Sequence, residues 1–279
     1  MASLINFTTL FGVKPANSTL ATPVNFRGSE NKVVTFNFEL EGYRDNFIYN
    51  PLGIELKDPS KIKKIAKENP RISVILKEHH LPLKVNMEAL QKLYSGHMKE
   101  TRILVANIFS NLPIELRQGI KGSDLQDAAM LHDYGKVLIP EKIYGKKGSL
   151  TPEEKEVMKL HSELGYELLK AQGVRESVCK LVKYHHQNPK GTGYPAIDDD
   201  FEYGIASQIL AIADKYSALT EYRCYREKPC TSKQALQTIY DEDVTGENKT
   251  ISLEVYNALK NYVNPQEPQE ELELHQDPI

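Results

Sequence analysis

An apolar pattern with helical spacing runs from Val85 to Val263 and predicts a mainly α-helical fold for most of this 279-residue chain. In successive segments apolar side chains recur every three or four residues, which is the pattern of a helix that buries one face. The clearest helix start is at Thr151, where Pro152 takes the first helical position and Glu154 completes a capping box. The pattern predicts helices at residues 90–108, 124–132, 151–173, 176–185, 205–219, 231–241 and 252–262.

The first 84 residues lack this pattern and predict a small mixed α/β module of unknown role. Apolar and polar residues alternate over 34–40, as in a half-buried strand. Residues 61–68 have helical spacing, and residues 72–76 predict a second short strand. Pro, Gln and Glu dominate the segment from 264 onward, which predicts a mobile acidic tail. The predicted domains are residues 1–84, 85–263 and 264–279.

Composition excludes several classes of protein. A net charge of −3 does not provide the basic face with which proteins bind duplex nucleic acid. The chain has no run of about 18 apolar residues and no signal-peptide pattern at its N-terminus, so the sequence predicts a cytoplasmic protein without membrane association. Its three cysteines, Cys179, Cys224 and Cys230, are odd in number and not closely paired, which argues against a disulfide framework.

Five of the eight histidines lie on or at the end of predicted helices: His97, His132, His161, His185 and His186. Each of them taken alone is more often a packed or surface residue than a metal ligand. Asp133 follows one of these histidines directly, and Asp214 lies at the end of the apolar run Leu210-Ala-Ile-Ala. A carboxylate buried in such a run needs a cation, either a metal ion or a basic side chain such as Lys215.

The five imidazoles and two carboxylates together exceed what one tetrahedral metal site uses. They suit two first-row metal ions bridged by one carboxylate, with iron, manganese, zinc and nickel as candidates. Two such ions can hold a hydroxide between them and clamp a phosphate group in line with it. The absence of cysteines near these positions argues against a structural zinc site.

Basic and glycine-rich segments follow the histidines. Lys136 comes soon after the first His-Asp pair and could contact a phosphate oxygen, although a lysine elsewhere would simply face solvent. The segment Gly191–Pro195 follows the His-His pair and by itself indicates only a tight turn. Arg223 and Arg226 offer forked donors suited to phosphate, and such residues are more often a surface cluster.

Four segments, in order, resemble the HD-GYP family of HD metal-dependent phosphohydrolases. They are LHDYGKVLIP (131–140), GSLTPEE followed by MKLH (148–161), HHQNPKGTGYP (185–195), and ILAIAD followed by ALT and RCYR (209–226). The corresponding family patterns are LHDxGKxxIP, LTpeE with MklH, HHExxDGxGYP, and ilaiaDxyDALtxxRxYR. The resemblance covers about residues 90–240, and four matches in the family order make a specific signal.

The resemblance implies an all-helical HD fold with a binuclear metal centre. Iron and manganese are the first candidates for the two metal ions, and zinc and nickel are the further ones. It also implies hydrolysis of a cyclic dinucleotide, c-di-GMP first, to pGpG and/or GMP in bacterial signalling. The implied metal ligands are His97, His132, Asp133, His161, His185, His186 and Asp214. Asp133 would bridge two metal ions, and Lys136 would contact the scissile phosphate. The remaining substrate-binding positions that it implies are Gly193, Tyr194, Pro195, Arg223 and Arg226. The glycine loop is also where the family contacts diguanylate-cyclase domains.

Four positions depart from the family pattern. Leu93 stands where members with a third metal ion have a Glu, so two metal ions are expected. Gln187, Lys190 and Ser217 replace a Glu and two Asp residues beside the implied ligands, which leaves the substrate open. Two alternatives therefore stand beside c-di-GMP hydrolysis: a cyclic-dinucleotide sensor or cyclase-binding module with weak catalysis, and a phosphodiesterase for cyclic GMP-AMP. The sequence also leaves open which metal binds and whether the protein forms a homodimer.

Overall fold

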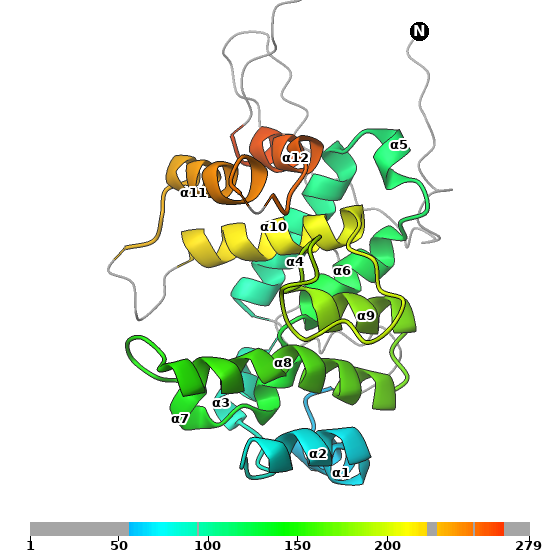
Figure 1. Ribbon diagram of the computed structural model, residues 1–279, viewed down its shortest axis with the longest axis vertical. Helices are drawn as coiled ribbons and strands as arrows, with labels where there is room; N and C mark the ends of the chain where they lie inside the picture. The colour runs from blue at the N-terminus through cyan, green and yellow to red at the C-terminus, as the bar shows by residue number, and fades with distance from the viewer. Residues whose placement is uncertain (1–55, 94, 222–227, 248, 265–279) are drawn as a thin grey trace, which may run out of the picture. The chain divides into compact units, whose positions relative to one another are not determined.

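The computed structural model describes residues 56–93, 95–221, 228–247 and 249–264, and this part of the chain is a bundle of helices without a β-strand (Figure 1). The predicted mainly helical fold is confirmed. None of the described helices has the length and apolar character needed to span a bilayer. The α-helices are α1 (Pro59–Glu68), α2 (Pro70–Glu78), α3 (Met87–Lys92), α4 (His97–Asn111), α5 (Ile114–Arg117), α6 (Gly122–Leu131), α7 (Glu141–Tyr144), α8 (Pro152–Ala171), α9 (Glu176–Tyr184), α10 (Ile205–Thr220), α11 (Ser232–Ile239) and α12 (Leu253–Val263). They are joined by a 3₁₀ helix, η2 (Tyr134–Leu138), and a π-helix, η3 (Tyr240–Val244).

Helix α4 is the centre of one group of helices and contacts α6, α10 and α12. A second set of contacts joins α8 to α9 and to η2, and α6 links the two groups because it also packs on α9. Leu125, Leu164 and Val182 are fully buried between these helices, and each such side chain contributes about 1.5–3 kcal/mol by its burial. As a result, the beginning of α4, the ends of α6 and α9, and the middles of α8 and α10 lie close together.

Helix α8 begins as the sequence predicts. Thr151 Oγ1 accepts a hydrogen bond from the Glu154 amide at 3.2 Å, and Glu154 Oε2 accepts one from the Thr151 amide at 2.8 Å. This capping box satisfies two backbone donors at the start of the helix. The helix ends at Ala171, two residues before the predicted end at Gly173, whose φ of 76° favours glycine.

The single helix predicted at 90–108 is wrong, because this segment forms two helices, α3 and α4. Gly96 directly precedes α4 with a φ of 50°, a conformation that L-residues rarely adopt. The break places His97 at the first position of α4 rather than inside a longer helix. The apolar spacing did not reveal it because Leu93, at the break, is buried like the helical residues around it.

The strand predicted at 72–76 is also wrong, because these residues belong to α2. Asn69 caps the helix by accepting hydrogen bonds from two backbone amides, and Pro70 takes the first helical position. The buried side chains have helical spacing: Ile72, Ile75 and Leu76.

The helix predicted at 61–68 is confirmed within α1, and both α1 and α2 pack against α8. The strand predicted at 34–40 and the acidic tail beyond residue 264 lie outside the described residues. The domain boundaries predicted at residues 84 and 263 stay predictions.

Candidate metal centre

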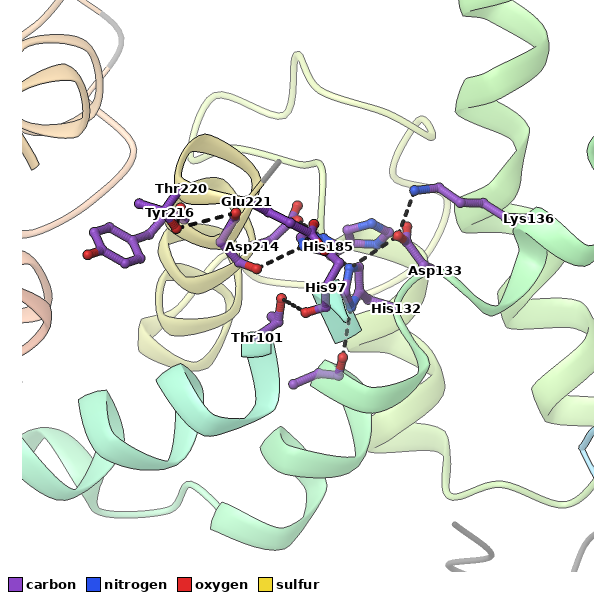
Figure 2. Close-up of polar contacts among 12 residues, drawn as sticks. His97, Thr101, His132, Asp133, Lys136, His185, Asp214, Tyr216, Thr220 and Glu221 are labelled. Atoms are coloured by element: carbon purple, nitrogen blue, oxygen red, sulfur yellow. Dashed lines mark hydrogen bonds and ion pairs between the residues drawn. The ribbon is translucent and has the colours of Figure 1, made fainter. Parts of the chain in front are cut away.

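The structure brings together all seven side chains that the motifs predict as metal ligands, from five places in the chain. Figure 2 shows five of them, with Lys136 beside Asp133. Six of the donors form two groups: His161, His185 and His186 in one, and His97, His132 and Asp214 in the other. Within each group the donor atoms all lie within 4.8 Å of one another, which is close enough to share one metal ion.

The seventh side chain, Asp133, lies between the two groups. Its Oδ1 is 3.5 Å from His161 Nε2, and its Oδ2 is 3.6 Å from His132 Nε2. Each carboxylate oxygen therefore faces a different group. This is the arrangement that a carboxylate bridging two metal ions requires.

Three of the histidines are oriented by their own helices. In His132, His161 and His185 the Nδ1 atom donates to the carbonyl oxygen three residues earlier, at 2.8, 2.7 and 2.6 Å. Because a carbonyl oxygen only accepts, Nδ1 carries the proton and Nε2 presents its lone pair to the centre. Histidines that bind metals are commonly fixed in this way by a second hydrogen bond.

Three buried ring nitrogens lack the hydrogen-bond donor that their lone pairs need. His132 Nε2 is buried and has no hydrogen-bond partner. His161 Nε2 and His185 Nε2 lie 3.2 Å apart, and both rings already donate from Nδ1. Buried acceptors without donors are destabilising, and a cation at the centre would satisfy them. The donor set of imidazole nitrogens and carboxylate oxygens therefore fits divalent first-row metal ions.

Burial keeps the histidines of the centre in the form that binds metal. It lowers the pKa of His161 to about 3 and that of His186 to about 4. It also lowers the pKa of His132 and of His185. These four imidazoles are neutral at pH 7, so metal binding does not have to displace a proton from them.

The two carboxylates stay ionised in spite of their burial. Burial alone raises the pKa of Asp133, but the Lys136 ammonium and the neighbouring histidines outweigh it and hold this pKa well below its usual range. Burial likewise works against Asp214, while His97 and His132 beside it hold its pKa low. The centre thus combines four neutral imidazoles with two anionic carboxylates.

The 3₁₀ helix η2 holds Asp133 and Lys136 against α8. Lys136 Nζ lies 2.6 Å from Asp133 Oδ2, and the lysine side chain is 23% exposed. A Cβ atom on Gly135 would lie 1.9 Å from the His161 carbonyl oxygen and 2.5 Å from the Gly165 amide nitrogen. Only glycine therefore allows η2 to lie directly on the backbone of α8.

On the other side of the centre, His97 contacts three side chains of α10 and its C-terminal end. Its Nε2 lies 2.8 Å from Asp214 Oδ1, and its Nδ1 lies 2.9 Å from Ser217 Oγ and 3.7 Å from Glu221 Oε2. The motifs predict Ser217 only as a departure from the family pattern and predict no role for Glu221. Their helical spacing from Asp214, at three and seven residues, was the signal that they share its face.

The segment Gly191–Pro195, which is the predicted substrate loop, lies over the group of His161, His185 and His186. The Tyr194 ring is 4.6 Å from the His186 ring at an interplanar angle of 31°, and it is edge-on to His161 at 6.4 Å. Arg223 and Arg226, the other predicted substrate residues, lie outside the described residues.

A cavity of about 360 Å³ borders His185, His186 and Asp214, and its size lies in the range of small-molecule sites. Tyr203, Thr250 and Ile251 line its other walls. Sequence motifs do not predict these three residues, because they come from loops outside the motifs.

The family model described as HD domain matches residues 82–245. The chain belongs to the HD domain family. This match, together with relatives named as cyclic di-GMP phosphodiesterases, confirms the HD-GYP resemblance.

Three curated relatives illustrate the similarity. A cyclic di-GMP phosphodiesterase of Thermotoga maritima is 36% identical over 49% of this chain and 36% of its own length. The cyclic di-GMP phosphodiesterase PdeB of Borreliella burgdorferi is 28% identical over 58% of this chain and 42% of its own. A 3'3'-cGAMP-specific phosphodiesterase of Vibrio cholerae is 36% identical over 39% of this chain and 21% of its own. The chain thus spans less than half of the length of each relative.

Proposed function

We propose that this protein is a metal-dependent phosphodiesterase that hydrolyses a cyclic dinucleotide, with c-di-GMP as the first candidate substrate. The observation that carries the proposal is the position of Asp133 between two groups of three donors. One oxygen of its carboxylate faces the first group, and the other oxygen faces the second. Relatives named as phosphodiesterases for c-di-GMP and for 3'3'-cGAMP support the substrate class.

His161, His185 and His186 would hold one metal ion, and His97, His132 and Asp214 a second, with Asp133 shared between them. Divalent ions bound there supply Lewis acidity toward phosphoryl oxygens and lower the pKa of water. Iron and manganese are the first candidates, and the nitrogen and oxygen donors also suit zinc and nickel. We propose two ions rather than three because Leu93, at the position of the family's extra Glu, is an apolar side chain only 1% exposed.

Lys136 would stabilise the charge that develops on the phosphoryl oxygens, because its ammonium lies beside Asp133 and its side chain is partly exposed. Gly193, Tyr194 and Pro195 would place the substrate beside the metal centre. Arg223 and Arg226 would bind its phosphates through forked donors. The product would be the linear dinucleotide pGpG, GMP, or both.

The decisive experiment is hydrolysis of c-di-GMP by protein purified without chelator and supplied with Fe²⁺ or Mn²⁺, with products resolved by chromatography. Wild-type protein should release pGpG or GMP, and Asp133→Ala should lose both the activity and bound metal. Asp241→Ala removes an exposed carboxylate on η3 and serves as the matched control. An Asp133→Ala protein with full metal content and full rate would refute the proposal.

A phosphodiesterase for cyclic GMP-AMP is the second candidate. It is favoured by the similarity to the 3'3'-cGAMP-specific enzyme and by the departures at Gln187 and Lys190 beside the substrate loop. Rates on c-di-GMP, 3'3'-cGAMP and mononucleotides would separate the two. Tight binding of a cyclic dinucleotide without turnover by metal-loaded protein would instead favour a sensor.

A further inference from the structure

The amide side chain of Gln187 ties the glycine loop to the backbone beside the metal centre. Its Nε2 donates to the Pro195 carbonyl oxygen, and its Oε1 accepts from the Gly193 amide at 3.0 Å. The Asn188 amide also points to Oε1, at 3.3 Å. Gln187 is only 4% exposed, so these hydrogen bonds are shielded from water.

The loop closes directly on the chain next to His186. The Tyr194 amide donates to the His186 carbonyl oxygen at 3.3 Å. A Cβ atom on Gly193 would lie 2.2 Å from the same carbonyl oxygen and 2.7 Å from Gln187 Cα. The close approach places the Tyr194 ring against the His186 imidazole, with 4.6 Å between their centroids.

His186 differs from the three histidines that their helices orient. It lies beyond the end of α9, and among the described residues its ring has no hydrogen bond to a backbone carbonyl. Its imidazole instead lies between the His185 ring at 3.9 Å and the Tyr194 ring at 4.6 Å. The orientation of His186 therefore depends on the position of Tyr194.

We propose that Gln187 is a positioning residue for His186. Its amide holds the loop, the loop holds Tyr194, and the Tyr194 ring fixes the imidazole that binds the metal ion. The inference rests on the proposed function, because it takes His186 as a metal ligand. It assigns a role to the residue at which this chain departs from the Glu of the family pattern.

The contacts at this position suit an amide better than a carboxylate in this chain. A carboxylate at position 187 would still accept from the Gly193 amide. It would have no N–H group for the Pro195 carbonyl oxygen, and one of its oxygens would face that carbonyl in a buried setting. Gln187→Glu therefore changes the function of the side chain with almost no change of shape.

Two measurements test the proposal on the whole 279-residue chain. The first is the rate of trypsin cleavage after Lys190, an exposed residue directly before the glycine loop, in metal-loaded protein. Gln187→Glu and Gln187→Met should each raise this rate about tenfold, because the loop opens more often. Gln237→Glu makes the same chemical change on the exposed face of α11 and should leave the rate unchanged.

The second measurement is a titration of chelator-treated protein with Co²⁺, followed by its visible absorption. Both Gln187 variants should bind one of two Co²⁺ ions about tenfold more weakly and change the spectrum of that ion. Tyr194→Leu should reproduce this result because it removes the ring. Tyr194→Phe should bind Co²⁺ like the wild-type protein because it keeps the aromatic ring.

Each outcome has a definite meaning. Faster cleavage with unchanged Co²⁺ affinity and spectrum would overturn the proposal, since the amide would then hold the loop without positioning His186. Unchanged cleavage would overturn it as well. Wild-type protein that binds no Co²⁺ would overturn the metal centre itself. Wild-type protein that binds Co²⁺ but hydrolyses no cyclic dinucleotide would refute the proposed function alone, and the comparison of the variants would still decide the role of Gln187.

Discussion

The Nε2 atoms of His161 and His185 lie 3.2 Å apart in the interior of the protein. Both rings donate from Nδ1 to a backbone carbonyl, so two lone pairs face each other. Burial lowers the pKa of both residues, which disfavours a proton shared between them at neutral pH. The folded protein therefore holds two facing acceptors whose repulsion a cation placed between them would relieve.

This arrangement predicts how the metal content responds to single substitutions. Wild-type protein should bind two divalent ions per chain, and His97→Ala should bind one, because the group of His161, His185 and His186 keeps all its donors. The number of ions is measured by elemental analysis after dialysis. His79→Ala, which removes a histidine at the end of α2, should keep both ions. Loss of both ions in His97→Ala would contradict the assignment of His97 to one group only.

Without metal, the stability of the protein should fall as the pH is lowered from neutrality. Burial puts the folded-state pKa of His161 at about 3 and that of His186 at about 4, below the ordinary value of 6.5. Between these values the unfolded chain binds more protons than the folded chain, so the free energy of unfolding falls with falling pH. Each such histidine contributes up to about 1.4 kcal/mol per pH unit below 6.5.

The measurement is denaturant unfolding of chelator-treated protein at pH 7 and pH 5.5. His161→Gln removes one of the titrating groups, and its free energy of unfolding should depend less on pH. A free energy of unfolding that is the same at both pH values would show that the imidazoles take up protons in the folded state as readily as in the unfolded chain.

The sequence, through the resemblance of its motifs to the HD-GYP family, predicted seven side chains that the structure brings together. His132 and His185 follow the last residues of α6 and α9, and the helical spacing that located those helices also placed the histidines at their ends. The capping box of Thr151 and Glu154 fixed the start of α8, and with it the position of His161 inside that helix.

Other features depend on distances between segments, which apolar spacing does not encode. The position of Asp133 between two groups follows from the packing of η2 on α8. The break before α4 depends on the backbone conformation of Gly96, and the hydrogen bonds of Gln187 depend on how the loop folds back. The strand predicted at 72–76 failed because the Asn69 cap and packing on α8 outweigh the strand preference of Ile and Val.

Lys136 should act on catalysis and not on metal binding. Lys136→Met removes the ammonium that lies 2.6 Å from Asp133 Oδ2 but leaves every proposed metal ligand in place. We expect kcat for the cyclic dinucleotide to fall about 100-fold or more, with two bound ions retained. The matched control is Lys146→Met, which breaks a surface ion pair with Glu154. Loss of metal in Lys136→Met, or an unchanged kcat, would contradict the role proposed for this lysine.

The last prediction concerns the contact that brings Asp133 to His161. In Gly135→Ala the new methyl group would lie 1.9 Å from the His161 carbonyl oxygen, and a backbone atom inside a helix cannot move aside as the end of a side chain can. The 3₁₀ helix must therefore shift away from α8, which separates the Asp133 carboxylate from the His161 imidazole. We expect a loss of about 1–3 kcal/mol in the free energy of unfolding and at least tenfold weaker metal binding.

Gly204→Ala is the control, since Gly204 has ordinary backbone angles and open space around a Cβ atom. Denaturant unfolding and Co²⁺ titration of the two variants give the comparison, and a Gly135→Ala protein with wild-type stability and metal affinity would show that η2 does not need this contact to place Asp133.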